Sequence, residues 1–298
     1  MTVPVGTASS LTHPILLPGT DLLAFIDNLG SLAVSQVGQI VASYDVNALT
    51  DARLLTDDAG RIMLLTGATD QYDHGVLGDA IEASGIMRID NPAAPEISFF
   101  IPIPDDLDIE GISAIWTDIT SDGIREIIVT LSNAQQGAQL AIFNDTGELI
   151  ATSPAIGRGY RWRHQIAVAP FGPNGELELV DVLIPHLGGA VEFFHLKDTD
   201  LQLVAQVPGF TSHVIDTRNL DMAAAGDFDG ERSIELLLPN QQRTELGAIR
   251  RTINGAEVIW GLSLNGKMVT NLEAVTFESG DIAVGVGRED GILQIWHP

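Results

Sequence analysis

The chain has 298 residues, a hydrophobic fraction of 45 % and a mean hydropathy of +0.19. No stretch approaches the roughly eighteen uncharged apolar residues that a membrane-spanning helix needs, and the lack of cysteine excludes disulfides and thiolate chemistry. The net charge of −25 repels nucleic-acid backbones and anionic membrane surfaces. We therefore expect neither a nucleic-acid partner nor membrane insertion.

One pattern recurs along the chain: a short apolar run, a polar or acidic turn with glycine, and a second apolar run. The turn glycines are Gly19, Gly60, Gly123, Gly175, Gly230 and Gly280. Their spacing averages roughly fifty residues, which is typical of one propeller blade for each repeat.

Each repeat continues with a polar loop, a third run such as GAQLAIFND or GAIRRTIN, and usually a fourth such as LQLVAQVPG. Four short runs separated by turn residues predict one antiparallel sheet. The first two runs are continuously apolar, which indicates inner strands packed on both faces, whereas the fourth run tends to alternate. Long helical periodicity is absent, so we predict an all-β protein.

These repeats predict a single β-propeller over residues 1–298, with six four-stranded blades as the first choice and seven as the alternative. The expected blades cover residues 11–46, 47–104, 108–154, 162–208, 218–266 and 270–298 with 1–10. The last blade lacks a fourth strand after Pro298. We therefore expect residues 3–8 to pair with the strand around Ile292 to Trp296 and to close the ring.

Two of the repeats, GDFDGERSIELLLP and TDITSDGIREIIVTLS, resemble the FG-GAP/VCBS repeats of integrin-like β-propellers. In that family, turns of the D-x-D-G type link the first two strands of a blade. The resemblance is good in two repeats, fair in two and poor in the first, and it implies a fold more than a chemistry. It also implies an extracytoplasmic location, whereas the first residues, MTVPVGTASSLTHP, lack the features of a secretory signal and indicate the cytoplasm.

The family resemblance implies one cofactor, because the acidic turns of well-preserved FG-GAP repeats hold Ca²⁺ through carboxylate oxygens. The residues that match as candidate ligands are Asp227, Asp229, Glu231 and Glu235 in one repeat, and Asp118, Asp122 and Glu126, with Thr120, in another. The alternative is that aspartate and glycine serve the geometry of the turn, since an aspartate side chain hydrogen-bonds its own backbone there.

Propellers bind ligands at the mouth of the central channel, where the loops from second to third strands and from blade to blade meet. Four of the seven histidines and most of the clustered arginines map to those loops. The predicted ligand-binding residues are His74, Tyr160, Trp162, Arg163, His164, His186, His213, Arg218, Asn219, Asp221, Asn240, Arg243 and Arg288. With Arg161, the arginines predict a locally positive well in an acidic surface.

Three functions fit this predicted cluster. A binding propeller would use the aromatic and arginine side chains to hold an anionic ligand, a carbohydrate or a protein partner. An enzyme, a polysaccharide lyase or hydrolase acting on an acidic carbohydrate, would use histidine or tyrosine as acid and base. A metal site would need several imidazoles on one ion. Because HExxH, GxSxG and phosphate-loop motifs are absent, we rank binding first, the enzyme second and a pure scaffold third.

Overall fold

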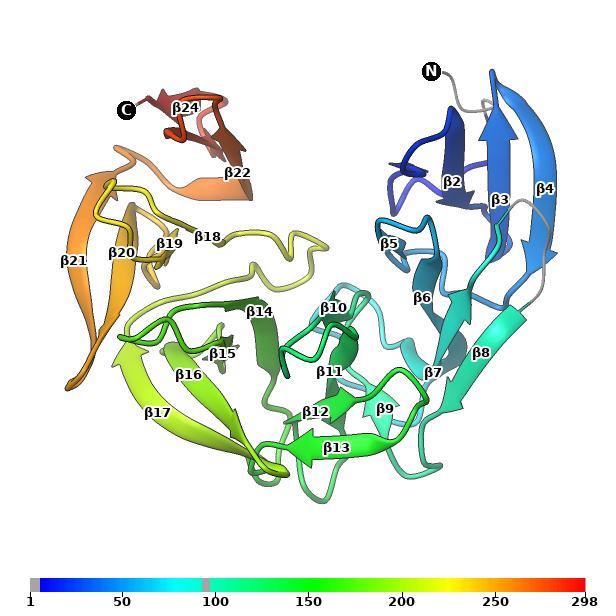
Figure 1. Ribbon diagram of the computed structural model, residues 1–298, viewed down its shortest axis with the longest axis horizontal. Coiled ribbons are helices and arrows are strands. Elements are labelled where there is room, and N and C mark those ends of the chain that lie inside the picture. Colours follow the sequence, from blue (N-terminus) through cyan, green and yellow to red (C-terminus); the bar gives the residue numbers. More distant parts are fainter. Residues whose placement is uncertain (1–5, 93–96, 298) are drawn as a thin grey trace.

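The computed structural model describes residues 6–92 and 97–297, and every regular element in them is a β-strand (Figure 1). The prediction of an all-β protein is therefore confirmed. No helix in these two ranges is long and apolar enough to cross a bilayer.

Consecutive strands form antiparallel groups, which we call blades. The first blade contains β1 (Ile15–Leu16), β2 (Leu22–Ile26), β3 (Ser31–Gln36) and β4 (Gln39–Asp45). The second contains β5 (Leu55–Thr56), β6 (Ile62–Thr69), β7 (Glu82–Ile89) and β8 (Ile97–Pro102). The third contains β10 (Ile115–Thr117), β11 (Glu126–Ser132), β12 (Gln139–Phe143) and β13 (Leu149–Thr152).

The remaining blades follow the same order along the arc (Figure 1). The fourth contains β14 (Arg163–Ala169), β15 (Glu178–Leu183), β16 (Ala190–Lys197) and β17 (Asp200–Pro208). The fifth contains β18 (Ala224–Gly226), β19 (Glu235–Pro239), β20 (Glu245–Thr252) and β21 (Gly255–Ser263). The last contains β22 (Met268–Thr276), β23 (Ile282–Arg288) and β24 (Leu293–Trp296).

Two short pairings join neighbouring blades into one larger sheet. The short strand β9 (Asp108–Ile109) pairs with β11 of the third blade and, through Ile109, with Ala83 of β7 in the second. A single parallel pair, Thr152 with Asp200, joins β13 to β17. Because β9 pairs with strands of two blades, Glu110, which directly follows β9, lies between the second and third blades.

The six repeated glycines lie in the turns between the first and second strands of the blades. Each of them has a positive φ, between 70° at Gly19 and 92° at Gly280. A Cβ atom at any of the six would meet no other atom within 4 Å. The glycine is therefore needed for the left-handed backbone of the turn and not for space.

The core lies between adjacent blades, which explains why the inner strands are continuously apolar. Every residue of β11 is buried. Its Ile127 and Val129 pack in the cluster shared with the first two blades, whereas Ile128 packs in the cluster shared with the fourth. Successive residues of a strand point to opposite faces, so a strand between two blades needs apolar side chains on both.

The expected closure of the ring is not found among the described residues. Ala8 forms a bridge with Asp27 of the first blade, and Ser9 N donates to Ile26 O. On the other side of the gap β24 pairs with β23 alone, and Figure 1 shows an open arc whose two ends stand apart. Residues 6–8 thus remain with the blade that follows them directly, where pairing closes the shorter loop. Residues 3–5 lie outside the described residues.

Candidate functional site

Loops from four parts of the chain meet in a small apolar cluster in the middle of the arc. Its buried members are Val76, Leu77, Ile112, Trp162 and Leu220. The long connection between β17 and β18 reaches into this region (Figure 1). The indole Nε1 of Trp162 donates to the backbone oxygen of Glu110 at 3.1 Å, and the side chain is only 2 % exposed. Trp162 is therefore buried at the centre of this cluster and offers no open stacking surface to a ligand.

Three of the predicted histidines surround Trp162. The indole stacks on His164, with ring centroids 4.6 Å apart and an interplanar angle of 14°, and on His186 at 6.0 Å. The ring of His213 meets it edge-on at 5.1 Å. Nδ1 of His164 lies 2.8 Å from Ser212 Oγ. The structure thus brings these four predicted residues together, as the loop assignment implied.

The hydrogen bonds of His213 define the protonation of the histidine pair. Its Nε2 lies 2.8 Å from the backbone oxygen of Thr217, which only accepts, so this nitrogen carries a hydrogen. In the neutral ring Nδ1 then accepts, and the partner at 2.8 Å, Nε2 of His186, donates. Burial lowers the pKa of both His186 and His213 to about 4. Both rings are therefore neutral near pH 7, and the two facing nitrogens are already used by each other.

The fourth predicted histidine, His74, contacts a buried carboxyl group. Its Nδ1 bonds one oxygen of Glu110, and the hydroxyl of Ser132 bonds the other. Its ring also packs beside Tyr72 and the exposed Tyr160. Burial raises the pKa of Glu110 against these hydrogen bonds, which lower it.

A second buried carboxyl, Glu82, lies close to this network. Its Oε2 accepts a hydrogen bond from Gly111 N at 3.0 Å. Burial, followed by the charge of Glu110, raises the pKa of Glu82 to about 9. The side chain therefore holds its proton at neutral pH, because two adjacent buried carboxylates cannot both be ionised cheaply.

Three of the five predicted arginines, Arg163, Arg218 and Arg288, pair with the protein's own acids. Arg163 is buried, and its Nη1 lies 2.7 Å from Asp181 and 2.7 Å from Glu192 within the fourth blade. Burial raises the pKa of Asp181 to about 7. Arg288 pairs with Asp290 at 2.5 Å in the last blade. These arginines hold strands and turns of their own blades.

Arg218 connects two loops. Its Nε lies 2.8 Å from Asp51 and its Nη2 lies 2.5 Å from Asp79, so its partners differ from Asp216 and Asp221, its acidic neighbours in sequence. Arg243 donates from Nη1 to the backbone oxygen of Met268 at 2.9 Å. Arg161 likewise donates to a backbone oxygen, that of Arg158, at 2.7 Å. Carboxylates therefore offset three of the five charges that were expected to form a positive well.

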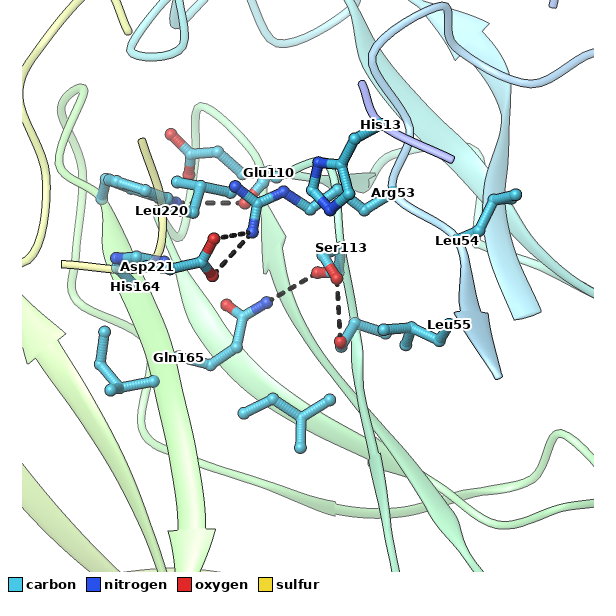
Figure 2. A pocket seen from close by; sticks show the side chains of 15 residues that line it. His13, Arg53, Leu54, Leu55, Glu110, Ser113, His164, Gln165, Leu220 and Asp221 are labelled. Carbon is cyan, nitrogen blue, oxygen red and sulfur yellow. Dashed lines mark hydrogen bonds and ion pairs between the residues drawn. The ribbon is translucent and has the colours of Figure 1, made fainter. Parts of the chain in front are cut away.

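A cavity of about 360 Å³ opens beside this network (Figure 2). Its walls come from the segments before β1, β5, β10, β14 and β18 and from the starts of β5, β10 and β14. The lining residues are His13, Arg53, Leu54, Leu55, Glu110, Gly111, Ser113, Ala114, Ile115, Trp162, His164, Gln165, Ile166, Leu220 and Asp221. Its size falls within the range of about 300–1,000 Å³ that is usual for small-molecule sites.

Two pairs of polar residues on the wall of this cavity bond each other, as Figure 2 shows. Arg53 Nη1 lies 2.7 Å from both carboxylate oxygens of Asp221. Gln165 donates from Nε2 to the backbone oxygen of Ser113 at 3.1 Å. The side chain of Asp221 is 51 % exposed, so the ion pair presents both a cation and an anion to whatever occupies the cavity.

Three more of the predicted residues, His186, His213 and Arg243, line a smaller cavity of about 190 Å³. It is lined by Pro185, His186, Thr211, His213, Val214, Ile215, Gln241 and Arg243. The two predicted asparagines have structural partners, because Asn219 Nδ2 donates to Val269 O at 3.0 Å and Asn240 Oδ1 accepts from Thr244 N at 3.0 Å. Asn219 also lines a third cavity, on the last blade, so the single rim predicted from the sequence is divided among three cavities and several loop contacts.

Comparison with solved structures gives matches over nearly the whole chain. The chain is similar to BBS1N, solved in complex with ARL6DN, with 14 % identity, a TM-score of 0.56 and coverage of 99 % of this chain and 80 % of that one. It is also similar to the Dos1 propeller, with 13 % identity, a TM-score of 0.54 and coverage of 93 % and 64 %. The chain is a β-propeller. At these identities the likeness shows the fold and no more.

A third solved structure similar to this propeller is a Bacteroides fragilis protein provisionally assigned as a 6-phosphogluconolactonase. The two share 15 % identity at a TM-score of 0.51, over 94 % of this chain and 78 % of that one. Neither the scan of protein-family models nor the search of curated proteins gives a match to the sequence.

The acidic turn of the fifth blade gathers three of its four predicted metal ligands around an arginine. Ligand oxygens of Asp227, Asp229 and Glu235 lie within 4.8 Å of one another. Arg250 reaches into the group, with its Nη2 2.5 Å from Asp229 and 2.6 Å from Glu235. The backbone N–H of Glu231 donates to Asp229. A guanidinium thus lies against the oxygens that the family resemblance assigns to Ca²⁺.

The acidic turn of the third blade uses its carboxylates on its own backbone. Asp118 accepts from the N–H groups of Asp122 and Gly123, and Glu126 accepts from that of Ile119 at 3.0 Å. Asp122 in turn accepts from Ile124 N. These contacts are those of an aspartate-stabilised turn, which is the alternative that the sequence left open.

Several residues of the larger cavity were missed by the sequence analysis, although a signal existed. Arg53 lies in the connection between the first two blades, and Glu110 and Ser113 lie in the connection that precedes β10. Both connections belong to the blade-to-blade class that was used to select Trp162 and Asp221. His13 precedes β1, and it lines the same cavity as Arg53 although it lies 40 positions earlier in the sequence (Figure 2).

Proposed function

We propose that this protein is a six-bladed, FG-GAP/VCBS-like propeller that binds a small polar ligand in the cavity lined by Arg53, Glu110, Ser113, Gln165 and Asp221. The six blades correspond to the six glycine turns, and the repeats GDFDGERSIELLLP and TDITSDGIREIIVTLS support the family assignment. The observation that carries the binding role is the cavity itself, about 360 Å³ in volume and placed where loops from several blades converge.

The polar groups on its wall favour a neutral carbohydrate over an anion. An anionic ligand would compete with Asp221 for Arg53, whose Nη1 already lies 2.7 Å from both carboxylate oxygens. A sugar hydroxyl both donates and accepts, so it can bond Asp221 while another accepts from Arg53. The apolar walls, such as Leu54 and Ile166, suit the less polar face of a sugar ring.

Binding is favoured over catalysis by the state of Glu110. A buried carboxyl with a raised pKa suits a general acid, and this feature keeps hydrolysis of a carbohydrate as the second candidate. However, both of its carboxylate oxygens are bonded, one to His74 and one to Ser132. Such a carboxyl group is held in place by two partners, as expected for a structural role beside a binding cavity.

The test is calorimetric titration with neutral oligosaccharides such as cellobiose and maltose and with oligosaccharides of uronic acids. We expect a neutral sugar to bind and Asp221→Asn to weaken it by on the order of tenfold, the value of one hydrogen bond to a charged group. Asp58→Asn is the control, since Asp58 is fully exposed and lies outside the cavity.

The outcomes separate the alternatives. If no oligosaccharide binds, or if Asp221→Asn binds as the native protein does, the proposed site is wrong. Tighter binding of uronic acids would restore the anionic ligand predicted from the sequence. Release of shorter sugars, measured by chromatography and lost in Glu110→Gln, would replace the binding role by hydrolysis. Binding of a protein partner at the same loops would be detected as protection of Asp221 and Arg53 from hydrogen exchange and covalent labelling.

A further inference from the structure

The last blade carries a groove on the face turned away from the fifth blade. Along β23, Val284 and Val286 pack in the cluster shared with the fifth blade, so Ala283, Gly285 and Gly287 face the other way. These three small residues line a cavity of about 550 Å³, together with side chains of β22 and β24 on either side. The central strand therefore forms the floor of a groove between its two neighbours.

Apolar side chains form the walls of this groove and are strongly exposed. Val275 of β22 is 57 % exposed, and Leu293 and Ile295 of β24 are 68 % and 52 % exposed. Gly285 pairs with Ile295 and Gly287 pairs with Leu293, so both side chains of β24 stand beside the glycine floor. The outer edge of β24 has no partner among the described strands. An exposed apolar groove beside a free strand edge marks an interaction surface.

The fifth blade shows what covers a glycine on the face that a blade turns to the next one. A Cβ atom built at Gly226 of β18 would lie 2.8 Å from the side chain of Ile282, which the next blade inserts over that glycine. At Gly285 the nearest atom to such a Cβ is 3.7 Å away and belongs to Ile295 of the same sheet. Among the described residues, only Asn219 and residues of β22, β23 and β24 line the groove, so it has room for a large apolar side chain from another sheet, stacked at about 10 Å.

The charges around the groove indicate which kind of partner can bind there. Glu273 lines the groove, and the turns at its two ends carry the exposed Glu278, Asp281 and Glu289. The nearby Arg288 is neutralised by Asp290. A second copy would add its own charge of −25 and the same acidic rim, which opposes self-association. A basic partner is complementary.

We propose that this groove docks a β-hairpin or sheet face of a partner protein, which places large apolar side chains over Gly285 and lysine or arginine side chains against the acidic rim. The partner's apolar residues occupy the space between Val275 and Ile295, as Ile282 does over Gly226. Its basic residues bond Glu273 and the two turns. This proposal is independent of the ligand proposed for the central cavity.

The probe is a disulfide-cyclised β-hairpin peptide with alternating valine and phenylalanine on one face and flanking lysines. Its counterpart has glutamate in place of every lysine. Binding is measured by fluorescence polarisation to the native protein and to two variants. Gly285→Phe fills the groove, and its backbone is outside the left-handed region, so a side chain is tolerated. Leu293→Glu adds a charge to the wall. Leu29→Glu, at an 88 % exposed site of the first blade, is the matched control.

We expect the lysine hairpin to bind, to weaken as salt is raised, and to lose about tenfold or more in affinity with each groove variant while Leu29→Glu is unaffected. The proposal is overturned if neither hairpin binds, if both bind equally, or if the groove variants bind as the native protein does. A dimer in sedimentation experiments that dissociates in Leu293→Glu would also overturn it, because the occupant would then be a second copy.

Discussion

Removing the guanidinium of Arg218 should destabilise the propeller, because this side chain joins two loops that are far apart in sequence. Its Nε lies 2.8 Å from Asp51, in the connection between the first two blades, and its Nη2 lies 2.5 Å from Asp79, in the loop between β6 and β7. In Arg218→Ala both carboxylates lose their partner, and the Asp51 side chain is only 6 % exposed.

The magnitude follows from this burial. Removing one partner of a fully buried ion pair costs about 3–5 kcal/mol, because the other charge stays buried and unpaired. The side chain of Arg218 is 24 % exposed, so solvent screens part of this cost. We therefore expect a loss of about 2–3 kcal/mol in the free energy of unfolding. At roughly 2–4 °C for each kcal/mol in a chain of this size, the melting temperature falls by roughly 4–12 °C.

The assay is urea unfolding and thermal melting of Arg218→Ala, with Arg158→Ala as the control for loss of an exposed arginine. The double variant Arg218→Ala, Asp51→Asn should recover part of the loss, since the stranded charge is then gone. An unchanged melting temperature in Arg218→Ala, or a double variant no more stable than the single one, would refute the structural role. Arg218 would then be free to act on a ligand, as the sequence analysis predicted.

Three further expectations follow from buried charges. The pKa of His213 in the folded protein is about 4, below its unfolded value near 6.5, so the contribution of His213 to stability is fully present above about pH 6.5 and is lost as the pH falls towards 4. Urea midpoints across this window should show the decline, and His213→Gln should flatten it; an equal slope in both would contradict the assignment. The pKa of Glu82 is about 9 when folded, so the contribution of Glu82 to stability is lost as the pH rises from about 4.5 to 9, and Glu82→Gln should be more stable than the native protein at pH 8 by on the order of 1–3 kcal/mol. If the stability difference between Glu82→Gln and the native protein were the same at pH 5 and pH 8, this would argue against a protonated Glu82. Arg250→Gln should lower the melting temperature without calcium and regain a few degrees at millimolar Ca²⁺, because its guanidinium no longer lies among Asp227, Asp229 and Glu235. The native protein should show no shift, and a calcium-dependent rise in its melting temperature would favour the metal site instead.

The sequence was sufficient to predict the all-β architecture. Continuous apolar runs such as EIIVTLS in β11 indicated strands packed on both faces, and the structure buries every residue of that strand. The turn glycines were found because a positive φ is a local requirement that one residue type meets at least cost. Closure was predicted from a missing strand alone, whereas Ala8 bonds to its own blade.

The candidate site was only partly predictable, because its chemistry depends on pairs that are distant in sequence. The loops of Trp162, His164, His186 and His213 were correctly expected to meet. Nothing in the sequence near Arg53 indicates that Asp221, 168 positions later, lies 2.7 Å away.

What the sequence by itself determined is therefore local: strands from apolar runs, turns from glycine and aspartate, and the set of loops that could carry a site. What only the tertiary structure decided is which charges meet. Folding places Arg250 against Asp229 and Glu235, and Arg218 against Asp51 and Asp79. The reason is physical, since Coulombic and hydrogen-bonding partners are selected by distance and burial, and neither quantity is encoded by spacing along the chain.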